Sequence, residues 1–121
     1  MPSYSWFIGR KAERLAKRFL ERQGYLIVER NVHLGQDEID LVSVHQNVVV
    51  FVEVRFRAEG LEAAELSVRG AKSQRLRRAV AAYRSQENLW AVPCRIDVVA
   101  VARTDTTWRL SHIKDAYSCG S

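Results

Sequence analysis

Residues 38–56, EIDLVSVHQNVVVFVEVRF, make up the most apolar part of the chain and predict two paired β-strands. Valine, isoleucine and phenylalanine dominate both halves, and these residues favour buried strands. The central HQN, with Asn47 as its turn former, predicts a hairpin between residues 38–44 and 48–56. Asp40 and Glu53 nevertheless lie inside the apolar runs, although carboxylates are almost never buried unless they are paired or bind a metal.

The segments around this hairpin predict a mixed sheet flanked by helices. In the first helix, residues 8–23, apolar side chains recur with helical spacing and Gly24 follows as a stop signal. Further strands are expected at 25–31, 94–103 and 107–113, a second helix at 71–85, a loop at 58–70 and a frayed tail from about 117. The order α-β-β-β-α-β-β indicates an α/β fold in a single domain spanning residues 1–121.

Composition excludes several classes of protein. With 47% hydrophobic residues the chain is expected to be globular, and its longest apolar run, residues 48–52, is far too short for a membrane span. The first twenty residues show no signal peptide, so we expect a cytoplasmic protein without a membrane partner. The net charge is +5 and 15 of the 19 basic residues are arginine, which favours a phosphate-bearing partner. On the first helix, the arginine-rich surface is either a solvated face or a phosphate-binding face.

The cysteines and histidines do not indicate a metal site. Cys94 and Cys119 lack metal-ligand spacing, and the three histidines are far apart in the sequence, so zinc is not expected. We expect Cys94 in the core and Cys119 exposed and unpaired, because disulfides are rare in cytosolic proteins. Asp97, in RIDVV, is interpreted as a structural residue paired with Arg95 or with a neighbouring helix.

Asp40 and Glu53 would lie side by side on one face of the sheet if their strands pair as a hairpin. Two adjacent carboxylates repel each other unless a divalent cation lies between them, and oxygen ligands suit Mg²⁺. Arg55 would then complete a phosphate pocket, and Glu13 on the first helix would reach its rim. The alternative is an interior ion pair of Asp40 or Glu53 with Arg55. Lys72 falls on the apolar stripe of the second helix, where it either snorkels to solvent or points toward this site.

The stretches GRKAERLAKRFLERQGYLIVERN, EIDLV, FVEVRFR, KSQRLRRAVAAY and RIDVVAV together resemble the bacterial YraN family. This uncharacterised group is thought to be distantly related to Holliday junction resolvases, within the PD-(D/E)XK nuclease superfamily. The resemblance spans roughly residues 9–113 and implies a restriction-endonuclease-like fold. It implies Mg²⁺ or Mn²⁺ as cofactor, bound by Asp40, Glu53 and the backbone carbonyl of Val54. The expected catalytic residues are Glu13, Asp40, Glu53, Arg55 and Lys72, and the expected DNA-binding residues are Arg10, Arg14, Arg57 and Arg75.

Two departures from the family pattern bear on activity. Asp37 stands where the family usually has glycine before its Glu-Ile-Asp, and Arg55 stands where it has lysine. Arginine does not give up its proton, so Arg55 cannot act as a general base, although it can hold a phosphate. Activity could then depend on the metal alone or on the ammonium group of Lys72.

Three functions are compatible with these residues. The first is a metal-dependent endonuclease that acts on DNA, with branched DNA as its expected substrate. A homodimer would suit a symmetric junction. The second is a nucleic-acid-binding module that has lost catalysis, which the arginine at position 55 favours. The third is a non-enzymatic assembly protein that contacts a partner through Trp6, Phe7 and the C-terminal tail, although we expect these aromatic residues to form a satellite core.

Overall fold

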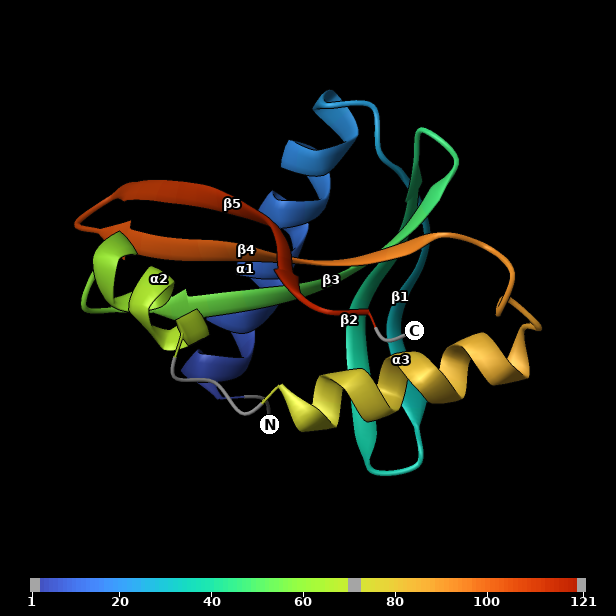
Figure 1. Ribbon diagram of the computed structural model, residues 1–121. Coiled ribbons are helices and arrows are strands. Elements are labelled where there is room, and N and C mark those ends of the chain that lie inside the picture. The colour runs from blue at the N-terminus through green and yellow to red at the C-terminus, as the bar shows by residue number, and fades with distance from the viewer. Residues whose placement is uncertain (1–2, 70–72, 120–121) are drawn as a thin grey trace.

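The computed structural model describes residues 3–69 and 73–119, which form a five-stranded sheet with helices on both faces (Figure 1). The elements in chain order are α1 (Tyr4–Arg22), β1 (Leu26–Leu34), β2 (Asp37–His45), β3 (Val48–Arg57), α2 (Leu61–Arg69), α3 (Gln74–Gln86), β4 (Cys94–Thr104) and β5 (Thr107–Tyr117). The strands lie in the order β1-β2-β3-β4-β5, with β3 and β4 parallel and the other neighbours antiparallel. The predicted mixed sheet flanked by helices is therefore confirmed. None of the described helices combines the length and apolar character needed to cross a membrane.

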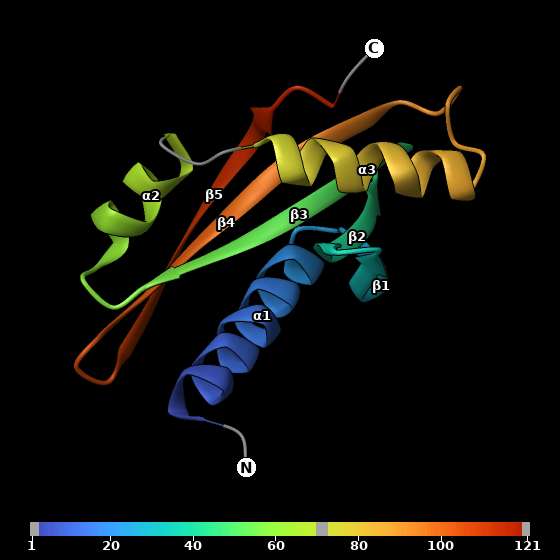
Figure 2. The same ribbon diagram turned by 90° about the horizontal axis from the view of Figure 1, so that it is seen from below.

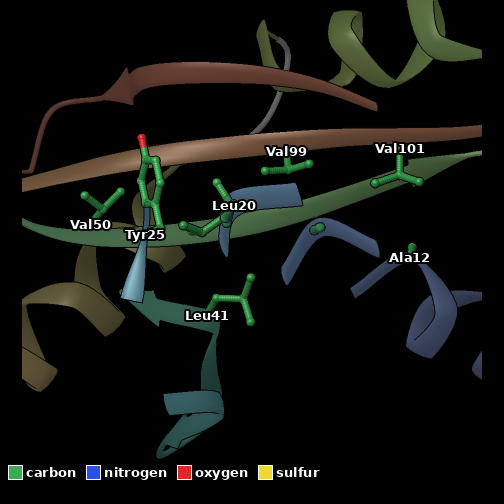
Figure 3. Close-up of a cluster of buried hydrophobic side chains, with 9 residues drawn as sticks. Ala12, Leu20, Tyr25, Leu41, Val50, Val99 and Val101 are labelled. Carbon is green, nitrogen blue, oxygen red and sulfur yellow. The ribbon is translucent and has the colours of Figure 1, made fainter. Parts of the chain in front are cut away.

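The helices form two layers that enclose the sheet, with α1 on one face and α2 and α3 on the other (Figure 2). Helix α1 buries Ala12, Ala16 and Leu20, which recur every four residues along one stripe. Figure 3 shows this stripe meeting side chains of β2, β3 and β4 in one apolar cluster. The helix begins four residues earlier than the sequence predicts, because the Ser3 hydroxyl accepts a hydrogen bond from the backbone N–H of Trp6 at 3.2 Å.

The hairpin predicted from residues 38–56 is present. His45 pairs with Val48, so the turn consists of Gln46 and Asn47 alone. Both turn residues have positive φ, 50° and 66°, as a two-residue turn that follows the twist of its strands requires. Asparagine tolerates this conformation well, whereas glutamine does so less readily, which explains why the sequence signal for the turn is incomplete.

A helix occupies most of the segment that was expected to be a loop, so that prediction is wrong. Among residues 61–68 of α2, whose burial the structure describes, Ala64 and Val68 are buried, and the helix packs against strands β3 and β4. Two buried residues in this stretch are too few to reveal a helical period in the sequence. The observed order is α-β-β-β-α-α-β-β, α3 begins at Gln74, and β5 continues to Tyr117, where the sequence had placed a frayed tail.

Asp97 has the structural role expected from the sequence. It is fully buried, and its carboxylate accepts hydrogen bonds from Arg95 Nε at 2.8 Å and from the backbone N–H of Asp115 at 2.9 Å. His112 Nε2 lies 2.8 Å from the same carboxylate. Burial alone would raise the pKa of Asp97, but these three partners outweigh it and lower the pKa to about 2. The network therefore holds an ionised aspartate that joins β4 to β5.

The two cysteines form a disulfide, Cys94–Cys119, which contradicts the prediction of an exposed and unpaired Cys119. Because β5 is longer than expected, the residues that follow it return to the beginning of β4. The carbonyl of Cys119 also accepts a hydrogen bond from Arg84 Nη1 at 3.5 Å. The end of the described chain is therefore fastened to α3 and β4 instead of frayed.

Candidate active site

Asp40 and Glu53 flank the point where β2 and β3 separate. The pairing of these strands extends as far as Leu41 with Val52, after which β2 continues against β1 and β3 continues against β4. Asp40 Oδ2 accepts a hydrogen bond from the backbone N–H of Val54 at 2.8 Å, so its carboxylate reaches across to β3. The divergence of the strands creates space for polar side chains between two otherwise apolar strands.

The carboxyl group of Asp40 lies among other acidic groups. Its pKa is raised to about 7, and burial is the largest cause. The charges of Glu13, Glu53 and Glu38 raise it further, whereas the hydrogen bond from Val54 lowers it in part. In the part of the chain that the structure describes, Asp40 forms no ion pair with a basic side chain. We call Glu13, Glu38, Asp40 and Glu53 the acidic centre.

Glu13 joins the acidic centre from α1, as the sequence predicts. Its side chain is 26% exposed, and its Oε1 atom lies 3.7 Å from Arg10 Nη1. The negative charge of Glu13 raises the pKa of Asp40. Asn31, with its amide oriented to satisfy both neighbours, donates to Glu13 Oε1 at 3.0 Å and accepts from Arg10 Nη1 at 2.8 Å. Burial raises the pKa of Glu13, and the nearby Arg10 guanidinium lowers it in part. Asn31 adopts a left-handed backbone, φ 52°, which sequence reasoning did not single out.

Glu53 and Arg55 form an ion pair, with 2.6 Å between Glu53 Oε2 and Arg55 Nε. Both side chains are mostly buried, with 24% and 21% of their surface exposed. Together with Ser73, Arg75 and Leu76 of α3 and its flank, they line a cavity of about 460 Å³. The interior ion pair that the sequence left open is thus present at Glu53, but it does not include Asp40.

The remaining predicted residues are divided between the site and its surroundings. Arg10 and Arg14 lie near Glu13, and Arg75 lies near Glu53. Arg57 donates from Nη1 to the carbonyl of Phe56 at 2.7 Å and lines neither of these cavities. Lys72 lies outside the described residues.

Asp37 proves to be a partner of α3. Its two carboxylate oxygens accept hydrogen bonds from Arg78 Nε and Nη2 at 2.7 and 2.8 Å. These hydrogen bonds lower the pKa of Asp37. Asp37 therefore ties β2 to α3 and is not part of the acidic centre.

Sequence reasoning missed a hollow beside the acidic centre. It measures about 270 Å³ and is lined by Trp6, Phe7, Arg10, Glu13, Arg14, Arg30 and Asn31, which we call the aromatic pocket. Trp6 and Phe7 are 46% and 58% exposed, so the prediction that they form a satellite core is wrong. They precede the buried stripe of α1, which begins at Ala12, and this position was the available signal that the core does not cover them.

The acidic centre offers the donor chemistry that Mg²⁺ prefers, because its members are carboxylates. In the arrangement seen, however, no three histidine, cysteine or acidic side chains within residues 3–69 and 73–119 converge closely enough to hold a metal ion. Asp40 is engaged by Val54, and Glu53 by Arg55. The residues suit a divalent cation because they are carboxylates and because a cation would relieve the repulsion between them. To bind a cation, Glu53 would have to turn away from Arg55.

Comparison with other proteins places the chain among uncharacterised relatives. The model of the uncharacterised protein family UPF0102 matches residues 12–101, which include the whole acidic centre. A UPF0102 protein of Marinobacter nauticus is 40% identical over 111 residues, 90% of either chain. Another from Hahella chejuensis is 39% identical, covering 93% of this chain and 90% of the relative. A third, from Shewanella oneidensis, is 43% identical, covering 84% and 94%. Their shared description states no activity.

Proposed function

The chain belongs to the uncharacterised protein family UPF0102, and we propose that it is a metal-dependent endonuclease that hydrolyses DNA phosphodiester bonds. The observation that carries the proposal is Asp40, a partly buried carboxyl group whose pKa is raised to about 7 by burial and by three neighbouring carboxylates. Strongly perturbed acids without a compensating cation cluster at functional sites. In chain order, Glu13, Asp40 and Glu53 follow the acidic pattern of the PD-(D/E)XK superfamily, to which we assign the fold.

In the proposed mechanism, Asp40, Glu53 and the backbone carbonyl of Val54 would hold a magnesium or manganese ion. Such an ion would lower the pKa of a bound water molecule and offset charge on the scissile phosphate. Arg55, no longer paired with Glu53, would form a charge-assisted hydrogen bond to the phosphate. Glu13 lies at the rim, where Asn31 and Arg10 hold its carboxylate in place.

Arg55 and Lys72 have different parts in this scheme. Arg55 holds and orients the phosphate but transfers no proton, because a guanidinium stays charged. Lys72 precedes α3, whose first residues line the cavity that also contains Glu53. If Lys72 supplies the superfamily's ammonium group, Lys72→Ala abolishes cleavage while Arg55→Ala retains it. The reverse result would assign the role to Arg55.

A second candidate function is a DNA-binding module that has lost catalysis. It is favoured by the ion pair between Glu53 and Arg55, which engages one of the two carboxylates proposed as metal ligands. Such a module would bind DNA equally well in Mg²⁺ and in EDTA. Its affinity would still fall steeply with salt, because phosphate contacts release counterions. Binding that ignores salt would instead favour a protein partner.

Cleavage of a small DNA panel tests the proposal. The panel contains a four-way junction, a flap, single-stranded DNA and duplex DNA, each with Mg²⁺, Mn²⁺ or EDTA. We expect metal-dependent cleavage that Asp40→Asn abolishes. Asp37→Asn is the matched control, since it makes the same change three residues away at a residue bound to Arg78, and it should cleave normally. Absence of cleavage, with salt-sensitive binding that EDTA does not change, would establish the binding module.

A further inference from the structure

The aromatic pocket exposes rings that a folded domain would ordinarily cover. Trp6 and Phe7 lie in the first turns of α1, with their ring centroids 5.1 Å apart and their planes at 84°. The Arg10 guanidinium carbon lies 5.3 Å from the centroid of the Trp6 ring. Contiguous exposed apolar surface with a polar rim marks interaction sites in soluble proteins. These rings are therefore available to stack on a planar partner.

The charges around the rings favour an anionic partner. Three arginines, Arg10, Arg14 and Arg30, line the aromatic pocket together with one carboxylate, Glu13. Arginine binds phosphate in bidentate fashion and stacks on aromatic faces. A polyanion carrying planar rings fits this combination better than an apolar peptide or a lipid tail, neither of which uses three guanidinium groups.

The aromatic pocket is continuous with the acidic centre. Glu13 belongs to both, and a neighbouring hollow of about 270 Å³ is lined by Trp6 as well as by Glu13 and Glu38. Asn31, which holds the Glu13 carboxylate, lines both hollows. A nucleotide seated on the rings would therefore lie beside the group of carboxylates proposed to cleave the strand.

We propose that the aromatic pocket binds an unpaired nucleobase, stacked on Trp6 or Phe7, while Arg14 and Arg30 contact the flanking phosphates. A paired base hides its faces in the duplex stack, so only single-stranded segments can present a face to these rings. The volume, about 270 Å³, is smaller than pockets for drug-sized ligands and suits one ring system. The inference deepens the proposed function: it assigns the substrate class as DNA with a single-stranded segment, such as a flap, beside the cleaved bond.

Equilibrium binding in EDTA tests this inference separately from catalysis. Fluorescence anisotropy would compare a flap, a single strand and a duplex of the same sequence at one salt concentration. The double variant Trp6→Ala/Phe7→Ala should weaken binding to the flap and single strand by about 10-fold or more, since each base that stacks on an aromatic ring adds to the affinity. Duplex binding should change by less than about 2-fold. Trp6→Tyr should keep the flap affinity of the wild type because it keeps an aromatic ring at this position.

Trp90→Ala is the matched control. Trp90 is 52% exposed, and its ring centroid lies 4.8 Å from the Arg84 guanidinium carbon. It is therefore an exposed tryptophan beside an arginine, as Trp6 is, but it does not adjoin the acidic centre. This variant should bind every substrate as the wild type does. Equal losses on duplex and single strand, or no loss in the double variant, would overturn the inference, as would binding of an apolar peptide or a vesicle in place of DNA. The proposed catalysis is tested separately, by comparing cleavage in Mg²⁺ by the wild type and by Asp40→Asn.

Discussion

Replacing Asp40 by asparagine should stabilise the folded protein at neutral and alkaline pH. Burial raises the pKa of this carboxyl group from 3.8 to about 7. Each pKa unit corresponds to about 1.4 kcal/mol, so ionised Asp40 destabilises the folded state by about 4 kcal/mol, an upper bound because water reaches a partly buried side chain. Asparagine removes the charge and still offers an oxygen to the N–H of Val54. We expect the free energy of unfolding at pH 8 to increase by about 2–4 kcal/mol.

The sign of the pH dependence follows from proton binding. Between pH 4 and pH 7 the folded state keeps the proton on Asp40 while the unfolded state loses it, so wild-type stability falls as pH rises through this window. Urea denaturation in EDTA at pH 4 and pH 8 would measure the effect. The stabilisation by Asp40→Asn should be present at pH 8 and small at pH 4. Asp37→Asn, the matched control, should not stabilise at either pH, because Arg78 already neutralises Asp37.

Magnesium supplies a third arm of the experiment. If Asp40 helps to hold the ion, added Mg²⁺ should stabilise the wild type at pH 8 and leave Asp40→Asn unchanged, since a ligand that binds only the folded state raises its stability. Should Asp40→Asn prove no more stable than the wild type at pH 8 in EDTA, the electrostatic reasoning behind the acidic centre would be refuted.

Three further predictions concern the rest of the chain. The partners of Asp97 lower its pKa from 3.8 to about 2, so acid titration should remove about 2 kcal/mol of stability as pH falls from about 4 to 2, and Asp97→Asn should remove this dependence. Cys94→Ser breaks a disulfide whose cysteines are 25 residues apart and should lower the free energy of unfolding by about 3 kcal/mol, while the wild type in dithiothreitol should match the variant. Arg14→Ala should reduce the slope of log affinity for DNA against log salt by about one, as measured by anisotropy over a salt series.

The sheet could be predicted from the sequence because its signals are local. Strands β2 and β3 are apolar runs joined by a short turn, and α1 has a continuous apolar stripe followed by a glycine. Helix α2 could not be predicted in this way, since the two residues buried among positions 61–68, the part of the helix whose burial is described, form no visible period. The disulfide escaped prediction because it depends on where a long β5 ends, and periodicity locates the ends of elements poorly.

The candidate site was predicted only in part, for a related reason. Asp40 and Glu53 are conspicuous because charge is rare inside apolar strands, and the pairing of β2 with β3 brings the two strand positions together. Asn31 and Glu38 were missed because polar residues near turns are common and carry no distinctive signal. The aromatic pocket was missed because it depends on how the first turns of α1 face β1, and this is a property of tertiary packing.

The sheet topology also has a consequence for the speed of folding. Strands β1, β2 and β3 form one unit of two consecutive hairpins, and β4 and β5 form a separate hairpin. Each unit can therefore form by local pairing that starts at its own turns. The parallel register of β3 with β4 joins residues that are 45 positions apart, from Val49 with Cys94 to Arg57 with Ala102. Closing that long loop loses chain entropy before its contacts form, and such non-local pairing slows folding. Docking of the two hairpin units along β3 and β4 is therefore the step at which we expect the transition state.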